Sequence, residues 1–188
     1  INDWRKQRNE PNFPFYFVQI APFNYGGDST AAAALRDAQR RTLDASPNTG
    51  MAITMDIGNA TNIHPADKQD VGKRLSYWAL NKTYGEKNIA YSGPLYKSLE
   101  IKTNKVIVSF TNTDGGLTSN NKPLRDFEVA GADGIWKPAS ASIDGDKVVV
   151  QSAAVSNPVA VRYAWYSYAD GSLFNGEGLP ASSFSSTP

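Results

Sequence analysis

The sequence predicts an α/β protein in two parts, an alternating strand and helix region followed by an antiparallel, β-sandwich-like region. In the first part, two apolar runs are each followed by a segment of helical period, which is the pattern of a parallel sheet with connecting helices. After about Asn88 the helical period stops, and short β-forming runs alternate with turn residues. We therefore predict a boundary near residue 88, with parts spanning residues 1–88 and 89–188.

The first strand and helix are predicted from composition and stop signals. Phe13–Pro22 is a nearly continuous apolar and aromatic run, typical of a strand buried on both faces. An Ala-rich segment with helical spacing predicts a helix over residues 30–46, for which Ser29 or Thr30 is the N-cap. Pro47 and the residues after it end this helix.

The second strand and helix follow directly. Residues 51–58 contain strong β-forming residues and predict the second strand. Residues 65–84 predict a second helix, with Pro65 in its first turn and Gly85 at its C-cap. Val71, Leu75 and Trp78 lie at helical spacing and define its apolar face.

The second part predicts several short strands joined by turns rich in Asp and Gly. The expected strands cover residues 99–101, 105–111, 126–130, 147–151 and 159–168. Residues 182–188 are mostly small and polar, and we expect them to be loosely ordered.

The composition excludes several classes of function. Nineteen Lys and Arg against eighteen Asp and Glu leave a net charge of +1, which favours neither nucleic acid nor an anionic membrane surface as a partner. No apolar run approaches the roughly 20 residues that cross a bilayer. The chain has no Cys and one His, so we predict no disulfide, no metal site and no cofactor.

His64, the only histidine, is the leading candidate for a catalytic residue. It follows the second predicted strand, and ligands of open α/β sheets bind beyond the carboxyl ends of the strands. An imidazole there suits a general base, and Asp56 lies close enough in sequence to orient it. Two other interpretations stay open: His64 caps the following helix, and Asp56 forms an Asx-turn with the N–H of Gly58 or Asn59.

A histidine base needs a nucleophile, and Gly27-Asp28-Ser29 is the one candidate motif. It spells the Gly-Asp-Ser of a large class of esterases and opens a helix. The match is only three residues long, and Ser29 as N-cap explains it without catalysis. No Gly-x-Ser-x-Gly elbow, P-loop or dinucleotide-binding motif occurs. We therefore interpret the chain as the second part of a hydrolase.

Aromatic residues of the second part have two interpretations. They could form a platform that stacks against sugar rings, or alternate members could fill the core, which we favour. These residues are Trp136, Tyr163, Trp165, Tyr166 and Tyr168.

Motifs along nearly the whole chain resemble the sialate O-acetylesterases. They are Asp3-Trp-Arg-Lys6, Phe13-Pro-Phe-Tyr-Phe-Val-Gln-Ile-Ala-Pro-Phe23, Leu35-Arg-Asp-Ala-Gln39, Met51-Ala-Ile-Thr-Met-Asp-Ile-Gly58, Ile63-His-Pro65, Lys68-Gln-Asp-Val-Gly-Lys-Arg-Leu75, Tyr91-Ser-Gly-Pro94, Phe127-Glu-Val-Ala-Gly131, Trp136-Lys-Pro-Ala139, Val161-Arg-Tyr-Ala-Trp165 and Asn175-Gly-Glu-Gly-Leu-Pro-Ala181. The resemblance implies an SGNH hydrolase, so that residues 1–88 would be the C-terminal part of a three-layer domain with a parallel sheet.

The resemblance also implies the roles of individual residues. His64 matches the histidine of the family's Ile-His-Pro motif and takes its catalytic role. The family's serine nucleophile precedes the region matching Asp3, so it would lie on an N-terminal part that is missing here. Many members carry Asp where this chain has Asn62. Asp56, a backbone carbonyl or an acid of the missing segment would then orient the histidine.

The function implied is hydrolysis of acetyl esters on sialic acid, with an O-acetylated sugar as substrate and the missing N-terminal part as partner. The resemblance further implies a secreted or periplasmic location. Three alternatives remain: an acetylxylan esterase-like enzyme, a carbohydrate-binding or structural β-module without activity, and a self-contained esterase that uses Ser29 and His64.

Overall fold

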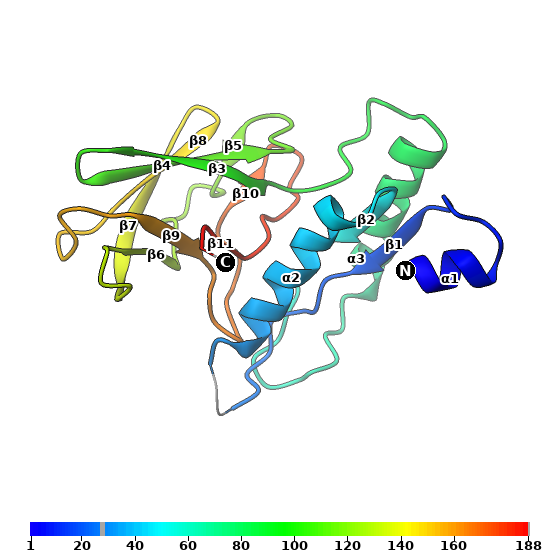
Figure 1. The fold of residues 1–188 in the computed structure, drawn as a ribbon, viewed down its shortest axis with the longest axis horizontal. Helices are drawn as coiled ribbons and strands as arrows, with labels where there is room; N and C mark the ends of the chain where they lie inside the picture. Colours follow the sequence, from blue (N-terminus) through cyan, green and yellow to red (C-terminus); the bar gives the residue numbers. More distant parts are fainter. Residues whose placement is uncertain (27–28, 188) are drawn as a thin grey trace.

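The computed structural model describes residues 1–26 and 29–187 and shows a mixed α/β fold dominated by antiparallel sheet (Figure 1). Its helices are α1 (Asn2–Gln7), α2 (Ala31–Ala45) and α3 (Lys68–Trp78), the last continued by a π-helical turn, η1 (Ala79–Thr83). No helix of this described part is long and apolar enough to cross a membrane.

Both predicted parallel strands are present but short, and the second covers residues 49–52, so the prediction of a strand over residues 53–58 is wrong. β1 (Phe15–Val18) pairs in parallel with β2 (Thr49–Ala52), with Phe15 opposite Thr49 and Val18 opposite Ala52. In contrast to the prediction, β1 is only half buried, and Val18 is 38% exposed. The physical reason is that β1 has a neighbouring strand on one side only, so one of its edges is open.

Close packing of α3 on this strand pair depends on Gly50. The glycine lies opposite Tyr16, and the indole of Trp78 from α3 covers both residues. A Cβ atom at position 50 would lie 2.5 Å from the Trp78 ring and 2.7 Å from the Tyr16 ring. Two of these three groups are rigid aromatic rings, so the contact has little room to relax.

We expect Gly50→Ala to lower the free energy of unfolding by about 1–3 kcal/mol, because the added methyl group overpacks this contact. Gly72→Ala is the matched control, since a Cβ atom there meets nothing within 4 Å. On the surface of α3, that change should raise stability by about 0.5–1 kcal/mol. Urea denaturation of both variants tests the pair, and equal effects would contradict the packing argument.

The two long helices, α2 and α3, start at or near their predicted first residues. α2 agrees with its prediction to within a residue at each end, with Thr30 as N-cap. The second helix starts at Lys68, three residues later than expected, because the Asp67 carboxylate accepts a hydrogen bond from Asp70 N at 3.0 Å. Asp67, and neither Pro65 nor His64, therefore sets the start of α3.

The second part forms a seven-stranded antiparallel sheet in the order β11-β9-β6-β7-β8-β4-β3. The strands are β3 (Leu95–Lys102), β4 (Lys105–Thr111), β6 (Phe127–Ala130), β7 (Trp136–Asp144), β8 (Lys147–Gln151), β9 (Ala160–Tyr163) and β11 (Phe184–Ser185), while β5 (Leu117–Thr118) and β10 (Phe174–Asn175) form a separate pair. β4 and β8 match their predicted ranges, and β9 ends five residues early.

β7 connects the two halves of this sheet. Its first residues, Trp136–Ala139, pair with β6, and residues 140–144 pair with β8. Figure 1 shows β7 running between the group of β3, β4 and β8 and the group of β6, β9 and β11. Valines of β4 and β8 lie in the same core as Phe127, Val161 and Tyr163 of the other half.

One hydrophobic core serves both parts of the chain. The buried cluster that contains the valines of the large sheet also contains Met51 of β2 and, just after that strand, Ile53 and Met55. The change of pattern near residue 88 thus separates two kinds of secondary structure around a shared core.

The expectation of a loose C-terminal segment is wrong for residues 182–185. Ser182, Ser183 and Ser185 are at most 6% exposed, and Phe184 is fully buried beside Tyr163 and Tyr96. Small polar side chains need partners when they are buried. Here Ser182 Oγ accepts a hydrogen bond from Gln19 Nε2 at 2.7 Å, and Ser183 Oγ donates to Ala164 O at 3.0 Å and accepts from Arg36 of α2.

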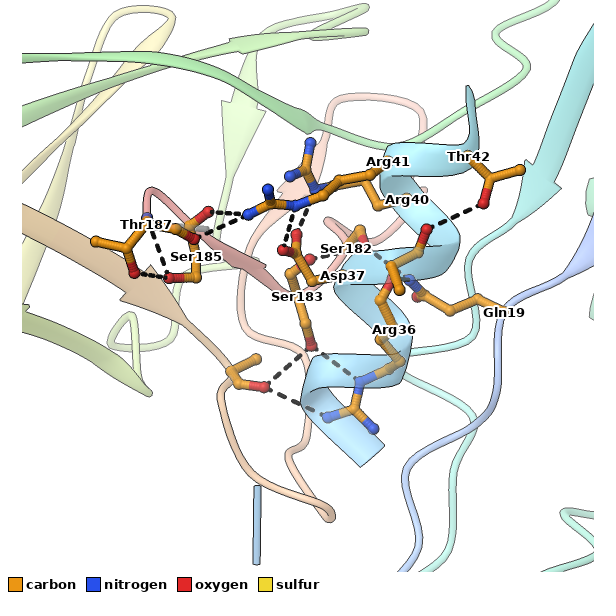
Figure 2. A network of polar contacts seen from close by, with 12 residues as sticks. Gln19, Arg36, Asp37, Arg40, Arg41, Thr42, Ser182, Ser183, Ser185 and Thr187 are labelled. Atoms are coloured by element: carbon orange, nitrogen blue, oxygen red, sulfur yellow. Dashed lines mark hydrogen bonds and ion pairs between the residues drawn. The ribbon is translucent and has the colours of Figure 1, made fainter. Parts of the chain in front are cut away.

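Arg36 of α2 is the centre of this contact (Figure 2). Its side chain is completely buried, and Nε donates to Ser183 Oγ at 2.9 Å. The remaining N–H groups donate to the carbonyl oxygens of Ala164, Tyr166 and Ser167. Burial lowers the pKa of Arg36 to about 10, so the guanidinium stays charged at neutral pH. Arg36 therefore joins α2, the segment after β9 and the C-terminal strand.

Candidate functional site

Three loops meet beyond the carboxyl ends of β1 and β2. Asn59 N donates to Pro22 O at 3.0 Å, and Asn24 N donates to Ala60 O at 3.3 Å, which ties the loop after β1 to the loop after β2. The segment after β9 joins them, since Phe23 N donates to Ser167 O at 3.2 Å and Gly171 N to Met55 O at 3.1 Å. Ligands of open α/β sheets bind at this edge.

His64 lies in the loop after β2, as predicted, and its side chain is exposed. Asn62 Oδ1 accepts a hydrogen bond from His64 N at 2.9 Å, which is an Asx-turn. The preceding turn is built in the same way, because Asn59 Oδ1 accepts from Thr61 N and Asn62 N, both at 2.9 Å. Two successive Asn side chains thus hold the backbone that presents His64.

The imidazole itself has no hydrogen bond or ion pair with any other residue of the described part of the chain. The interpretation of His64 as a helix cap is wrong, since Asp67 caps α3. An exposed imidazole without a structural partner is available to exchange a proton with a bound substrate or nucleophile.

Asp56 lies at the start of the same loop, where Arg74 of α3 holds its carboxylate. Arg74 Nη1 and Nη2 donate to the two carboxylate oxygens at 2.7 Å and 2.6 Å, and Nη1 also donates to Ile53 O at 2.7 Å. The Asx-turn predicted for Asp56 is not formed with Asn59, whose N–H is bound to Pro22. Both oxygens of Asp56 therefore face Arg74, and a direct action of Asp56 on His64 stays a prediction.

We expect Asp56→Asn to lower the free energy of unfolding by about 1–3 kcal/mol, because the side chain of Arg74 is only 8% exposed and would lose its anionic partner. Asp67→Asn is the matched control. Asn caps a helix as well as Asp does, so that variant should unfold like the wild type. Equal stability of all three proteins would show that the Asp56–Arg74 pair does not hold the loop.

The remaining candidates are the Gly27-Asp28-Ser29 motif and the aromatic residues of the second part. Gly27 and Asp28 lie outside the described residues, and the backbone carbonyl of Ser29 accepts a hydrogen bond from Ser167 N. Tyr163 is fully buried, and its hydroxyl accepts from Ser172 N at 2.8 Å and Leu173 N at 3.1 Å, so it belongs to the core. Tyr168 is 41% exposed, whereas Trp165 and Tyr166 are half buried.

Two arginines that hold the site were not predicted. Arg74 anchors Asp56, and Arg36 holds the loop that contacts Phe23. Both lie at helical spacing from other buried residues of their helices, Arg36 between Ala32 and Arg40, and Arg74 four positions before Trp78. A charge on the apolar face of a helix is the signal that would have found them, since buried charges require partners. No group of His, Asp and Glu side chains in the described part could hold a metal ion.

Known proteins resemble this chain in sequence and in fold. No family model matches the chain. Curated relatives are the sialate O-acetylesterases of Mus musculus, 29% identical over 88% of this chain, Rattus norvegicus, 31% over 84%, and Homo sapiens, 30% over 88%. The chain belongs to the sialate O-acetylesterase family. It spans 32–36% of the length of these family members.

A solved structure extends the family likeness to the fold. The crystal structure of a carbohydrate acetylesterase from Xanthomonas citri is 42% identical and superposes with a TM-score of 0.92 over 98% of this chain. The match covers 44% of that protein. The fold of both parts of the chain, including the large antiparallel sheet, is therefore shared with an acetylesterase.

Proposed function

We propose that this chain is part of a carbohydrate O-acetylesterase that hydrolyses acetyl esters on sialic acid. The supporting observation is the combination of a family likeness over 84–88% of the chain with an exposed, unengaged His64 at the ligand-binding edge of a parallel strand pair. His64 would be the catalytic base.

The mechanism needs a nucleophile from the rest of the protein. A serine hydroxyl on that part would attack the acetyl carbonyl while His64 takes its proton. His64 would then return the proton to the sugar oxygen as that oxygen leaves, forming an acetyl-enzyme. A water molecule, deprotonated by His64, would attack the acetyl-enzyme, and His64 would pass that proton to the serine oxygen as acetate leaves. Backbone N–H donors would stabilise the oxyanion formed in each step.

The missing part would complete a three-layer, SGNH-type domain. The open edge of β1 and its exposed apolar neighbours support this proposal, because Val18, Leu35 and Trp4 are 38%, 48% and 56% exposed. Parallel sheets are normally covered on both faces and extended at their edges. A second polypeptide segment would bury these groups and supply the serine. By the same likeness, we propose a secreted or periplasmic location.

A second substrate class is favoured by one comparison. The carbohydrate acetylesterase is 42% identical to this chain, against 29–31% for the mammalian sialate O-acetylesterases. That protein's name specifies no sugar. Acetylxylan, the alternative that the sequence resemblance implies, therefore stays the second candidate substrate. A separate β-module with only a binding role is disfavoured, because the large sheet shares its core with Met51, Ile53 and Met55.

Acetate release tests the proposal. The full-length protein encoded by the gene should release acetate from O-acetylated sialic acid, and the 188-residue chain alone should not. Preferred hydrolysis of acetylxylan would select the second substrate class. Activity of the 188-residue chain alone would contradict the hypothesis that the nucleophile lies on another part of the protein. Ser29 would then be the candidate nucleophile.

A further inference from the structure

The open edge of β1 is capped at one end by the side chain of Gln39. This residue lies on α2, and its carboxamide reaches the backbone just beyond the strand. Nε2 donates to Val18 O at 3.2 Å, and Oε1 accepts from Ile20 N at 2.9 Å. One carboxamide thus satisfies a C=O and an N–H of the strand edge, as the N–H and C=O of one residue in a neighbouring parallel strand would.

The register of β1 shows that these two groups point away from β2. Phe15 N donates to Asn48 O and Gln19 N to Ala52 O, so the N–H groups of the odd-numbered residues face β2. Backbone groups of alternate residues point to opposite sides of a strand. The even-numbered residues, Tyr16, Val18 and Ile20, therefore face the open edge.

Gln39 consequently divides this edge in two. The N–H and C=O of Tyr16 and the N–H of Val18 are left for pairing with another strand, whereas Val18 O and Ile20 N are already bound. A strand approaching from outside would gain two hydrogen bonds at Tyr16 and one at Val18. At Val18 O and Ile20 N, the added strand would meet the carboxamide of Gln39.

We propose that Gln39 ends the pairing of one further parallel strand, which the rest of the protein adds to β1 and which reaches no farther than Val18. This inference rests on the proposed function, since the occupant is the part of the protein that this chain lacks relative to its family. The chain spans 32–36% of the curated relatives, which leaves ample length for that strand. We take the added strand to be parallel because it would then continue the parallel pairing of β1 with β2.

The position of Gln39 has a consequence for the site. Val18 lies opposite Ala52, the last residue of β2, after which the chain leaves the sheet toward Asp56 and His64. A parallel strand stopped at Val18 would leave the sheet at the same level and toward the same edge. Gln39 therefore acts as a positioning residue, which directs the loop after the added strand toward the loop of His64.

Amide hydrogen exchange in the full-length protein tests this inference. We expect the amides of Tyr16 and Val18 to be protected by the added strand and the amide of Ile20 by Gln39. Gln39→Leu should speed exchange at Ile20 by about fivefold, the effect of losing one partly exposed hydrogen bond, and leave Tyr16 and Val18 protected. Gln39→Glu keeps the acceptor and should leave Ile20 protected. Gln69→Leu on exposed α3 is the control and should change none of the three amides.

Each other outcome overturns the inference. Unprotected amides at Tyr16 and Val18 would exclude a strand on this edge. Unchanged exchange at Ile20 in Gln39→Leu would show that a strand, and not the carboxamide, binds that amide. If Gln39→Leu does not fold, Gln39→Ala takes its place, and unchanged exchange at Ile20 in that variant gives the same negative answer. Acetate release from the same wild-type sample separates the two proposals, because protection without activity contradicts the proposed function alone.

Discussion

Replacing His64 with Gln in the full-length protein is expected to lower kcat/KM for acetate release by on the order of 10³-fold. Glutamine can still form hydrogen bonds, but it cannot take a proton from a nucleophile. The change should leave the protein folded, because the imidazole is exposed and only the backbone N–H of this residue is held, by Asn62. Thermal unfolding and initial rates on the same samples separate the two effects.

Added imidazole provides the control for this variant. If His64 acts as the base, free imidazole should restore part of the activity of His64→Gln and have no effect on the wild type. A variant that keeps more than about a tenth of the wild-type rate would exclude His64 from proton transfer, since a general base contributes roughly 10²–10⁴-fold.

Replacing Arg36 with Met is expected to lower the free energy of unfolding by about 3–5 kcal/mol. Methionine fills a similar volume but leaves the Ser183 hydroxyl and the carbonyl groups of Ala164, Tyr166 and Ser167 without their donor. Each buried acceptor left without a partner costs about 1–3 kcal/mol. Urea denaturation measures the loss.

Limited proteolysis extends this test to the C-terminal strand. Arg36→Met should make residues 182–187 accessible to protease, because Ser183 loses its contact with α2. Arg8→Met, at an exposed position, is the matched control and should stay within about 0.5 kcal/mol of the wild type. A resistant C-terminal strand in Arg36→Met would show that Phe184 packing alone holds it.

The elements that could be predicted from sequence are those whose signals are local. α2 has an Ala-rich helical period with Pro47 after it, and β4 and β8 are short runs of β-branched residues between turns. β7 was missed because its inward positions are small, such as Ala139 and Ala141, and because Pro138 argues against a strand. Its existence depends on pairing with β6 and β8, which local pattern does not reveal.

The candidate site also contains residues that local sequence predicts and residues that depend on distant partners. The place of His64 after a strand follows from the order of elements along the chain, whereas the partner of Asp56 is an arginine 18 residues away. The burial of Ser182 and Ser183 depends on Gln19 and Arg36, which are 163 and 147 positions away in sequence. Long-range polar contacts of this kind carry no periodic signal, so composition alone suggested a loose segment.

The bond between Arg36 and Ser183 also dictates an order of events during synthesis. The 147 positions between them take roughly 7–30 s to translate at about 5–20 residues per second. For most of that interval the carbonyl groups of Ala164, Tyr166 and Ser167 are also absent, so the guanidinium of the nascent chain stays in water. The core shared by both parts of the chain includes Phe184, so it is completed only when the last β-strand has emerged.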